Sequence, residues 1–241
     1  MTLPSWILDS DEITYAVMAD HWLNGSVLYR DIIDIKPPGI FMIFALIQIV
    51  FGKSMLAIRL ITIGVVAGSA YFLYRTKRQI GFSFESALIS SIAFILMFNF
   101  YFGFASNAEV FFIFTTSLGV HIFFRARSSI DYFLTGIIFG IGFCIKQLIL
   151  FDLAALGLFF FMTSLKSGDL EQKVVPMALI VLGFLIPFGL AHLTFWAAGH
   201  FDGYYFVTYV APGNYMSERT WQDTVTFLSK GILVYLPFIL L

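Results

Sequence analysis

Long apolar runs alternate with short polar connections along most of the chain. A helix that crosses a bilayer needs about 20 apolar residues, with a range of about 17–25. Six runs reach or approach this length, at 54–74, 85–103, 108–124, 130–145, 148–163 and 174–197. A seventh begins near residue 226 and is truncated at the end of the chain. The pattern predicts an all-α fold, a polytopic transmembrane helix bundle.

One apolar run is too short to cross a bilayer. It covers residues 40–51, between Gly39 and Gly52. At about 1.5 Å per residue, its 12 residues extend about 18 Å as a helix, against about 30 Å of hydrocarbon. We therefore expect a juxtamembrane or re-entrant helix. The predicted organisation is a first loop with juxtamembrane helices at 1–53 and a transmembrane bundle at 54–241, with six spanning helices and the truncated seventh.

Composition supports a membrane protein and excludes several other classes. Hydrophobic residues make up 59% of the chain and charged residues 12%, and the mean hydropathy is +0.89. Soluble domains are about 45–50% apolar and about 25% charged. A single cysteine, Cys144, excludes a disulfide scaffold, and a net charge of −1 gives no sign of nucleic-acid binding.

Basic residues predict the orientation of the bundle. Half of the 14 Lys and Arg residues lie in three short connections, at 75–78, 125–127 and 166–173. The positive-inside rule places these connections in the cytoplasm. The first loop, the connections near residues 103–108 and 146, and the segment 198–226 then lie outside. We expect a multi-pass protein of the cell membrane, the bacterial inner membrane in particular, with its chemistry on the extracytoplasmic face.

The first candidate site lies near the start of the chain. On a helix, Asp11, Tyr15 and Trp22 share one face, which combines a carboxylate with two aromatic rings. Such a face suits a sugar, since the carboxylate accepts hydroxyl protons and a ring packs against C–H groups. The alternative is a capped helix start with solvated acids, in which Asp9 or Ser10 is the cap.

The second candidate site precedes the short apolar run. Asp34 and Lys36 stand immediately before Pro37 and Pro38, which stiffen the backbone. A lysine at the membrane surface can hold a lipid phosphate, and an aspartate there can hold a metal ion or a sugar hydroxyl. The alternative is an interfacial anchor without a catalytic role.

Three further residues are candidates. Glu109 begins a predicted spanning helix after Asn107, where a simple helix start is the alternative. Lys146 is expected at or in the membrane, where charged residues are functional or paired; a structural pair with Asp152 is the alternative. His200 is a candidate metal ligand near the outer face, although the pattern favours a hydrogen-bonded histidine without metal.

The order of these segments resembles the GT-C class of membrane glycosyltransferases, of the protein O-mannosyltransferase and aminoarabinose transferase type. The segments that carry the resemblance are Asp11-Glu12, Tyr15-Ala16, Tyr29-Arg30-Asp31, Asp34, Lys36-Pro37-Pro38, Phe51-Gly52, Arg59-Leu60 and the glycines that precede Lys146. The chain differs from some aminoarabinose transferases, which have an arginine where this chain has Thr14 and an acid directly beside the lysine. The members are also longer, and both ends of this chain look cut, so we expect a fragment.

The resemblance implies an enzyme that moves a sugar from a polyprenyl-phosphate carrier to a lipid, glycan or protein acceptor, with inversion at the anomeric carbon. Asp11 matches the catalytic acid of the first loop and would be the general base, and Glu12 beside it is the other catalytic candidate. Lys36 matches the residue near the carrier phosphate, and Tyr15 and Lys146 match other substrate-binding positions. Asp34 or Glu109 would be the second acid, which binds either the donor or a divalent metal ion. A divalent metal ion is the candidate cofactor.

Two other functions remain open on the sequence alone. A transporter is one, with Glu109, Lys146 and Asp152 along an ion path, although the chain shows no inverted repeat. A non-catalytic membrane fragment is the other.

Overall fold

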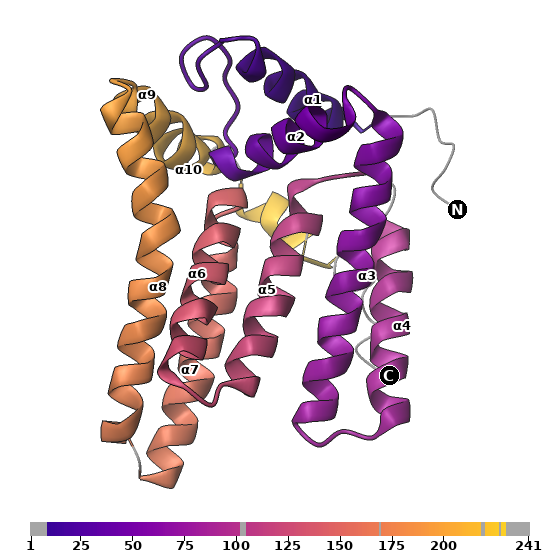
Figure 1. The fold of residues 1–241 in the computed structure, drawn as a ribbon, viewed down its shortest axis with the longest axis vertical. Coiled ribbons are helices and arrows are strands. Elements are labelled where there is room, and N and C mark those ends of the chain that lie inside the picture. The colour runs from indigo at the N-terminus through magenta and orange to yellow at the C-terminus, as the bar shows by residue number, and fades with distance from the viewer. Residues whose placement is uncertain (1–8, 102–104, 169, 218–219, 227, 230–241) are drawn as a thin grey trace.

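The computed structural model describes residues 9–101, 105–168, 170–217, 220–226 and 228–229 (Figure 1). The helices are α1 Ser10–Leu23, α2 Pro38–Phe51, α3 Met55–Gln79, α4 Phe84–Tyr101, α5 Ala108–Arg125, α6 Ser129–Ile145, α7 Ile149–Ser167, α8 Leu170–Ala197, α9 Phe201–Tyr205 and α10 Ala211–Ser217, with a π-helix at Phe206–Val210. The six long apolar runs correspond, in order, to the six helices from α3 to α8. Most of the predicted seventh run lies outside the described residues. The all-α prediction is confirmed.

The helices form two parts that run in different directions. Helices α3 to α8 run side by side along the long axis, whereas α1 and α2 lie across one end of them (Figure 1). Helix α2 starts at Pro38, two residues earlier than the apolar run, because proline suits the first helical position. Residues 40–51 thus lie in a helix that runs across the bundle axis (Figure 1), and it stays a prediction that this helix does not cross the membrane.

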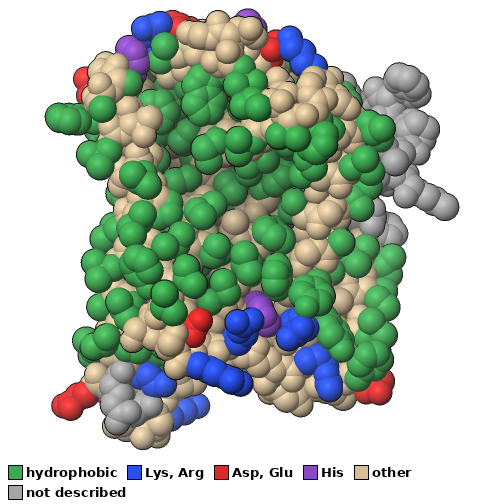
Figure 2. Space-filling view, in the orientation of Figure 1, with side chains coloured by type: hydrophobic (Ala, Val, Ile, Leu, Met, Phe, Trp, Pro, Cys, Tyr) green, Lys and Arg blue, Asp and Glu red, His purple; other side chains and the backbone are tan. Residues whose placement is uncertain are grey.

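The bundle has the surface of a membrane protein. In the part of the chain that the structure describes, four helical segments are long and apolar enough to cross a bilayer, at Met55–Gln79, Ala108–Arg125, Ile149–Ser167 and Lys173–Ala197, and α4 and α6 are shorter apolar helices. Apolar side chains cover the flank of the bundle, and charged side chains gather at its two ends (Figure 2). The chain is therefore a multi-pass membrane protein.

Glycines bring α6 and α8 into backbone contact. A Cβ atom on Gly136 would lie 2.0 Å from the carbonyl oxygen of Ile180, and one on Gly183 would lie 2.1 Å from that of Phe133. Small residues at such crossings allow helices in a membrane to pack closely without a hydrophobic driving force between them. This contact fixes how α6 is rotated, and α6 carries Lys146 at its end.

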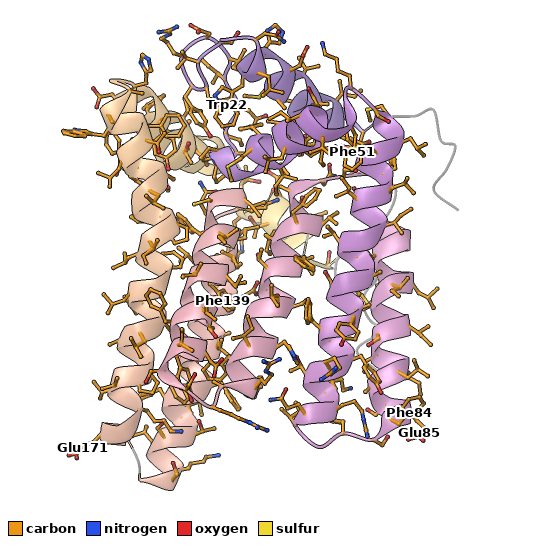
Figure 3. All side chains as sticks on the ribbon, in the orientation of Figure 1. Trp22, Phe51, Phe84, Glu85, Phe139 and Glu171 are labelled. Atoms are coloured by element: carbon orange, nitrogen blue, oxygen red, sulfur yellow. The ribbon has the colours of Figure 1, made fainter. Side chains whose placement is uncertain are left out.

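An aromatic core joins the end layer to the bundle. Tyr15 of α1 packs edge-on against Phe41 and Phe44 of α2, with ring centroids 5.9 and 5.6 Å apart, and Phe44 contacts Phe111 of α5 at 6.3 Å. These side chains are almost fully buried. A second core lies within the bundle around Phe139, at mid-depth (Figure 3). The first core holds α1 and α2 in place over the ends of α5 and α6.

Candidate functional site

The Asp11 side chain does not cap α1, because another residue caps the helix. The cap is Asp9, whose Oδ1 accepts a 3.0 Å hydrogen bond from the Asp11 N–H. The Asp11 side chain is 46% exposed, and its Oδ2 accepts a 3.1 Å hydrogen bond from the Tyr15 hydroxyl. The alternative of a capping role thus applies to Asp9, while Asp11 keeps an accessible carboxylate oriented by Tyr15.

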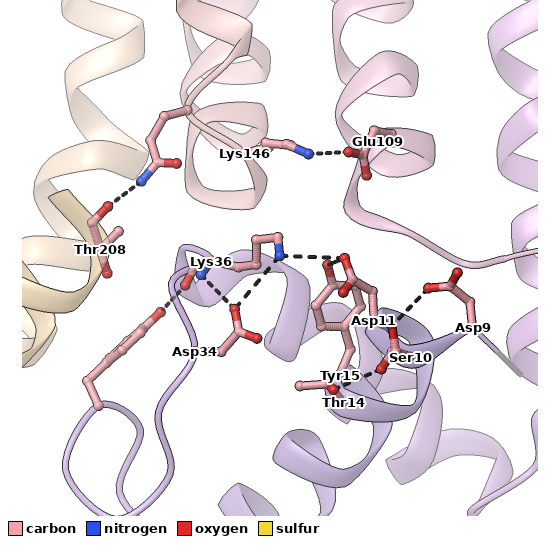
Figure 4. A network of polar contacts seen from close by, with 12 residues as sticks. Asp9, Ser10, Asp11, Thr14, Tyr15, Asp34, Lys36, Glu109, Lys146 and Thr208 are labelled. Carbon is pink, nitrogen blue, oxygen red and sulfur yellow. Dashed lines mark hydrogen bonds and ion pairs between the residues drawn. The ribbon is translucent and has the colours of Figure 1, made fainter. Parts of the chain in front are cut away.

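Lys36 is brought to Asp11 by the loop between α1 and α2. Its Nζ lies 3.5 Å from Asp11 Oδ2 and 4.0 Å from Asp34 Oδ1 (Figure 4). It also lies 5.7 Å from the centroid of the Tyr15 ring. The Lys36 side chain is 19% exposed, so the ammonium group sits among partners and does not extend into solvent. Residues up to 25 positions apart in the sequence thus form one polar cluster, which consists of Asp11, Tyr15, Asp34 and Lys36.

The backbone of Lys36 is held on both sides. Its N–H donates to Asp34 Oδ1 at 2.8 Å, and its carbonyl accepts a 2.8 Å hydrogen bond from the Tyr29 hydroxyl. Tyr29 is nearly buried and has a positive φ of 66°, an unusual conformation for a non-glycine residue. Sequence reasoning noted Tyr29 only as part of a motif. Here it is a positioning residue that fixes where the Lys36 side chain begins.

Glu12 does not join this cluster. It faces the bundle, is 0% exposed, and its Oε2 accepts a 2.7 Å hydrogen bond from Nη2 of Arg59 in α3. Consecutive helical residues point about 100° apart, so one acid faces the cluster and the next faces α3. The structure therefore does not bring the two predicted catalytic residues, Asp11 and Glu12, to the same place. Glu12 instead attaches α1 to α3.

Glu109 and Lys146 form a second polar group that faces the first. Lys146 caps the end of α6 and donates a hydrogen bond from Nζ to Oε1 of Glu109, in the first turn of α5 (Figure 4). The partner of Lys146 is thus Glu109 and not Asp152, which accepts a 2.9 Å hydrogen bond from Thr116. After Lys146, the Gln147 side chain donates to the carbonyl of Thr208 at 2.8 Å, which ties this turn to the segment after α8.

The carboxylates of both polar groups affect the pKa of Tyr15. Burial raises the pKa of its phenol well above the ordinary value, and the carboxylates of Asp11, Asp34 and Glu109 raise it further. The phenol therefore stays protonated and acts as a hydrogen-bond donor, not as a base.

The three candidate metal ligands are not assembled. Asp34 lies beside Lys36, Glu109 is paired with Lys146, and His200 precedes α9. Within the described ranges, no group of three or more His, Cys, Asp or Glu side chains is placed to hold a metal ion.

Comparison with known proteins identifies a family. The family model described as dolichyl-phosphate-mannose-protein mannosyltransferase matches residues 35–192, from just before the cluster lysine to near the end of α8. Neither the curated proteins nor the solved structures contain a significant match.

Proposed function

The chain belongs to the dolichyl-phosphate-mannose-protein mannosyltransferase family, and from this premise we propose that it transfers a sugar from a polyprenyl-phosphate carrier to an acceptor hydroxyl at the cluster of Asp11 and Lys36. Membership makes it a membrane glycosyltransferase of the GT-C kind. The observation that carries the proposal is the 3.5 Å contact between the Asp11 carboxylate and the Lys36 ammonium group. It places a base beside a cation that can bind a phosphate.

In the proposed reaction, Asp11 takes the proton of the acceptor hydroxyl as its oxygen bonds to the anomeric carbon. The bond from that carbon to the carrier phosphate breaks with its electron pair, and the phosphate leaves carrying the added charge. A cation aimed at this phosphate stabilises the transition state most, because the charge develops there. Lys36 is the group we assign to that role, with Asp34 and Tyr29 holding its backbone.

Donor binding must first open the contact between Asp11 and Lys36. In an inverting displacement the incoming hydroxyl and the leaving phosphate lie on opposite faces of the sugar, so base and cation need more space than 3.5 Å. We propose that the phosphate replaces Asp11 as the partner of Lys36. This exchange frees Asp11 to accept a proton only once a donor is in place. The flexible lysine side chain allows it, since only the backbone is fixed.

An apolar cavity at the same end of the molecule as the cluster suits the lipid part of such a donor. It has a volume of about 340 Å³ and is lined by Trp22, Pro38, Met42, Ile141 and Pro187, among others. Pro38 begins α2 two residues after Lys36, and Trp22 lies at the same end of the molecule (Figure 3). We propose that the first isoprene units of the carrier occupy this cavity while its phosphate reaches Lys36.

The proposed site is extracytoplasmic. The connections rich in Lys and Arg, after α3, α5 and α7, lie at the end of the bundle opposite α1 and α2 (Figure 1). By the positive-inside rule that end faces the cytoplasm. The polyprenyl-phosphate sugar is then used at the outer surface.

The test compares two variants with matched controls, by transfer of labelled mannose from a polyprenyl phosphate and by donor binding, each normalised to folded protein. Asp11→Asn should lower transfer by at least about a hundredfold and retain donor binding, since general bases contribute about 10²–10⁴. Lys36→Met should weaken donor use by about 10- to 150-fold, the value of a charged hydrogen bond. Asp20→Asn and Lys53→Met, which remove an exposed ion pair at the same end, should have little effect. Wild-type donor use by Lys36→Met, or near-normal turnover by Asp11→Asn, would refute the proposal.

A further inference from the structure

The end of the bundle opposite the candidate site contains two adjoining cavities of about 350 Å³ each, between α3, α5 and the start of α6. Both cavities include Arg75, near the end of α3, and Arg125, the last residue of α5. Arg78 and Arg127 line the second cavity as well. Four arginines from two helices and their connections therefore converge on one place, which we call the arginine pocket.

The arginine pocket carries a net positive charge. Within the described ranges, none of the four guanidinium groups forms an ion pair with an Asp or Glu side chain. Arg75 donates to the Tyr71 hydroxyl and Arg78 to the Phe82 carbonyl, both at 2.9 Å.

The acid that lines the pocket is already engaged. Asp131 Oδ2 accepts hydrogen bonds from the backbone N–H groups of Arg127 and Ser128 and from the Ser128 hydroxyl, at 2.9 to 3.0 Å. Through this capping box the Asp131 side chain binds the start of α6 and not a guanidinium group, and one carboxylate faces four arginines.

The pocket changes from charged to apolar toward the middle of the bundle. Tyr71 and Phe72 precede Arg75 by about one helical turn on α3. On α5, Leu118 and Ile122 precede Arg125 in the same direction, and all four line the first cavity. Figure 2 shows the blue side chains at this end directly below the apolar flank. A phospholipid has the same order, with an anionic phosphate at the surface and acyl chains deeper.

We propose that the arginine pocket binds the phosphate head group of an anionic membrane phospholipid, with an acyl chain against Tyr71, Leu118 and Ile122. Basic residues at membrane surfaces commonly attract anionic lipids without forming a site. Here the charges converge on a shaped cavity with an apolar wall, and an anion would relieve the repulsion among the four arginines. The proposal does not depend on the proposed transfer reaction, because the pocket lies at the other end of the bundle.

The experiment measures binding of fluorescent phosphatidic acid and phosphatidylcholine to the purified chain in neutral detergent. The double variant Arg75→Gln/Arg125→Gln should bind phosphatidic acid about thirtyfold more weakly, because it removes two positive charges that attract the anionic head group. Lys166→Gln/Lys173→Gln removes two charges from the same end outside the pocket and should leave binding within about twofold. Phosphatidylcholine should bind weakly to all three proteins.

Two further measurements separate a lipid site from a folding defect and from a site for free phosphate. Arg75→Lys/Arg125→Lys keeps the charge and should retain most of the binding, which separates lost charge from misfolding. Inorganic phosphate should not displace the fluorescent lipid at the same concentration. Equal losses in the two glutamine variants would show a general surface effect, and displacement by inorganic phosphate would show a free-phosphate site. Either result would overturn the proposal.

Discussion

Replacing Glu12 by glutamine should weaken the attachment of α1 to the bundle. The ion pair between Glu12 and Arg59 has an N–O distance of 2.7 Å, and the two side chains are 0% and 8% exposed. Removing one partner of a buried ion pair costs about 3–5 kcal/mol, because the other charge stays buried without compensation. In Glu12→Gln that charge is a guanidinium, which does not lose its proton in proteins. The full cost therefore remains.

The other variants of the pair should cost less. Arg59→Met leaves a carboxyl group, which can become neutral by taking up a proton, so the penalty is smaller. Glu12→Gln/Arg59→Met removes both charges, and neutral groups of similar volume often replace a buried ion pair without loss of stability. The expected order of destabilisation is Glu12→Gln, then Arg59→Met, then the double variant.

Hydrogen–deuterium exchange of the α1 amides in the detergent-solubilised chain measures this order. A cost of about 3–5 kcal/mol raises the opening equilibrium by about 10²–10⁴, so α1 amides in Glu12→Gln should exchange faster by that factor until global unfolding limits it. Asp20→Asn, which removes the charge of the partly exposed ion pair between α1 and Lys53, is the control and should exchange within about fivefold of the wild type, since such pairs contribute little to stability. Equal acceleration in both single variants, with additive effects in the double variant, would refute the reasoning.

Four other outcomes are expected. Gly39→Ala should lower transfer, because the added Cβ would lie 2.5 Å from the Cys144 carbonyl oxygen and push α2 away from α6. Gly64→Ala, which has open space around it, is the neutral control. Equal transfer by the two variants would contradict this prediction. Burial raises the pKa of Tyr15 above its ordinary value of 10.0, so its stabilising contribution is complete below pH 10.0 and is lost as pH rises above it; Tyr15→Phe should show a smaller alkaline fall in unfolding temperature than the wild type. Polyprenyl phosphate should slow labelling of Cys144, which lines the apolar cavity, by an uncharged maleimide; unchanged labelling would exclude that cavity as the lipid site. In intact cells a cysteine at position 77, in a Cys144→Ser background, should be inaccessible to an impermeant reagent, and labelling from outside would reverse the proposed orientation.

Properties that depend on short segments could be predicted from the sequence. The length and apolarity of each run predicted helices at the positions of α3 to α8, and the run at 40–51 predicted the short helix α2. The break at Lys146 was also expected, although no glycine or proline marks it. These predictions succeeded because the hydrophobic effect and the dimensions of a bilayer act on each segment by itself.

Side-chain partners depended on the tertiary structure. Hydropathy does not reveal how a helix is rotated about its axis, and this rotation decides that Glu12 meets Arg59 and that Lys146 meets Glu109 instead of Asp152. The close contact of Gly136 with α8 fixes the rotation of α6, which carries Lys146 at its end. The sequence by itself determined an all-α membrane bundle and the acids and lysine of a candidate site. Only the packing of helices distant in sequence decided which of those residues face one another, because it depends on surfaces that no single segment contains.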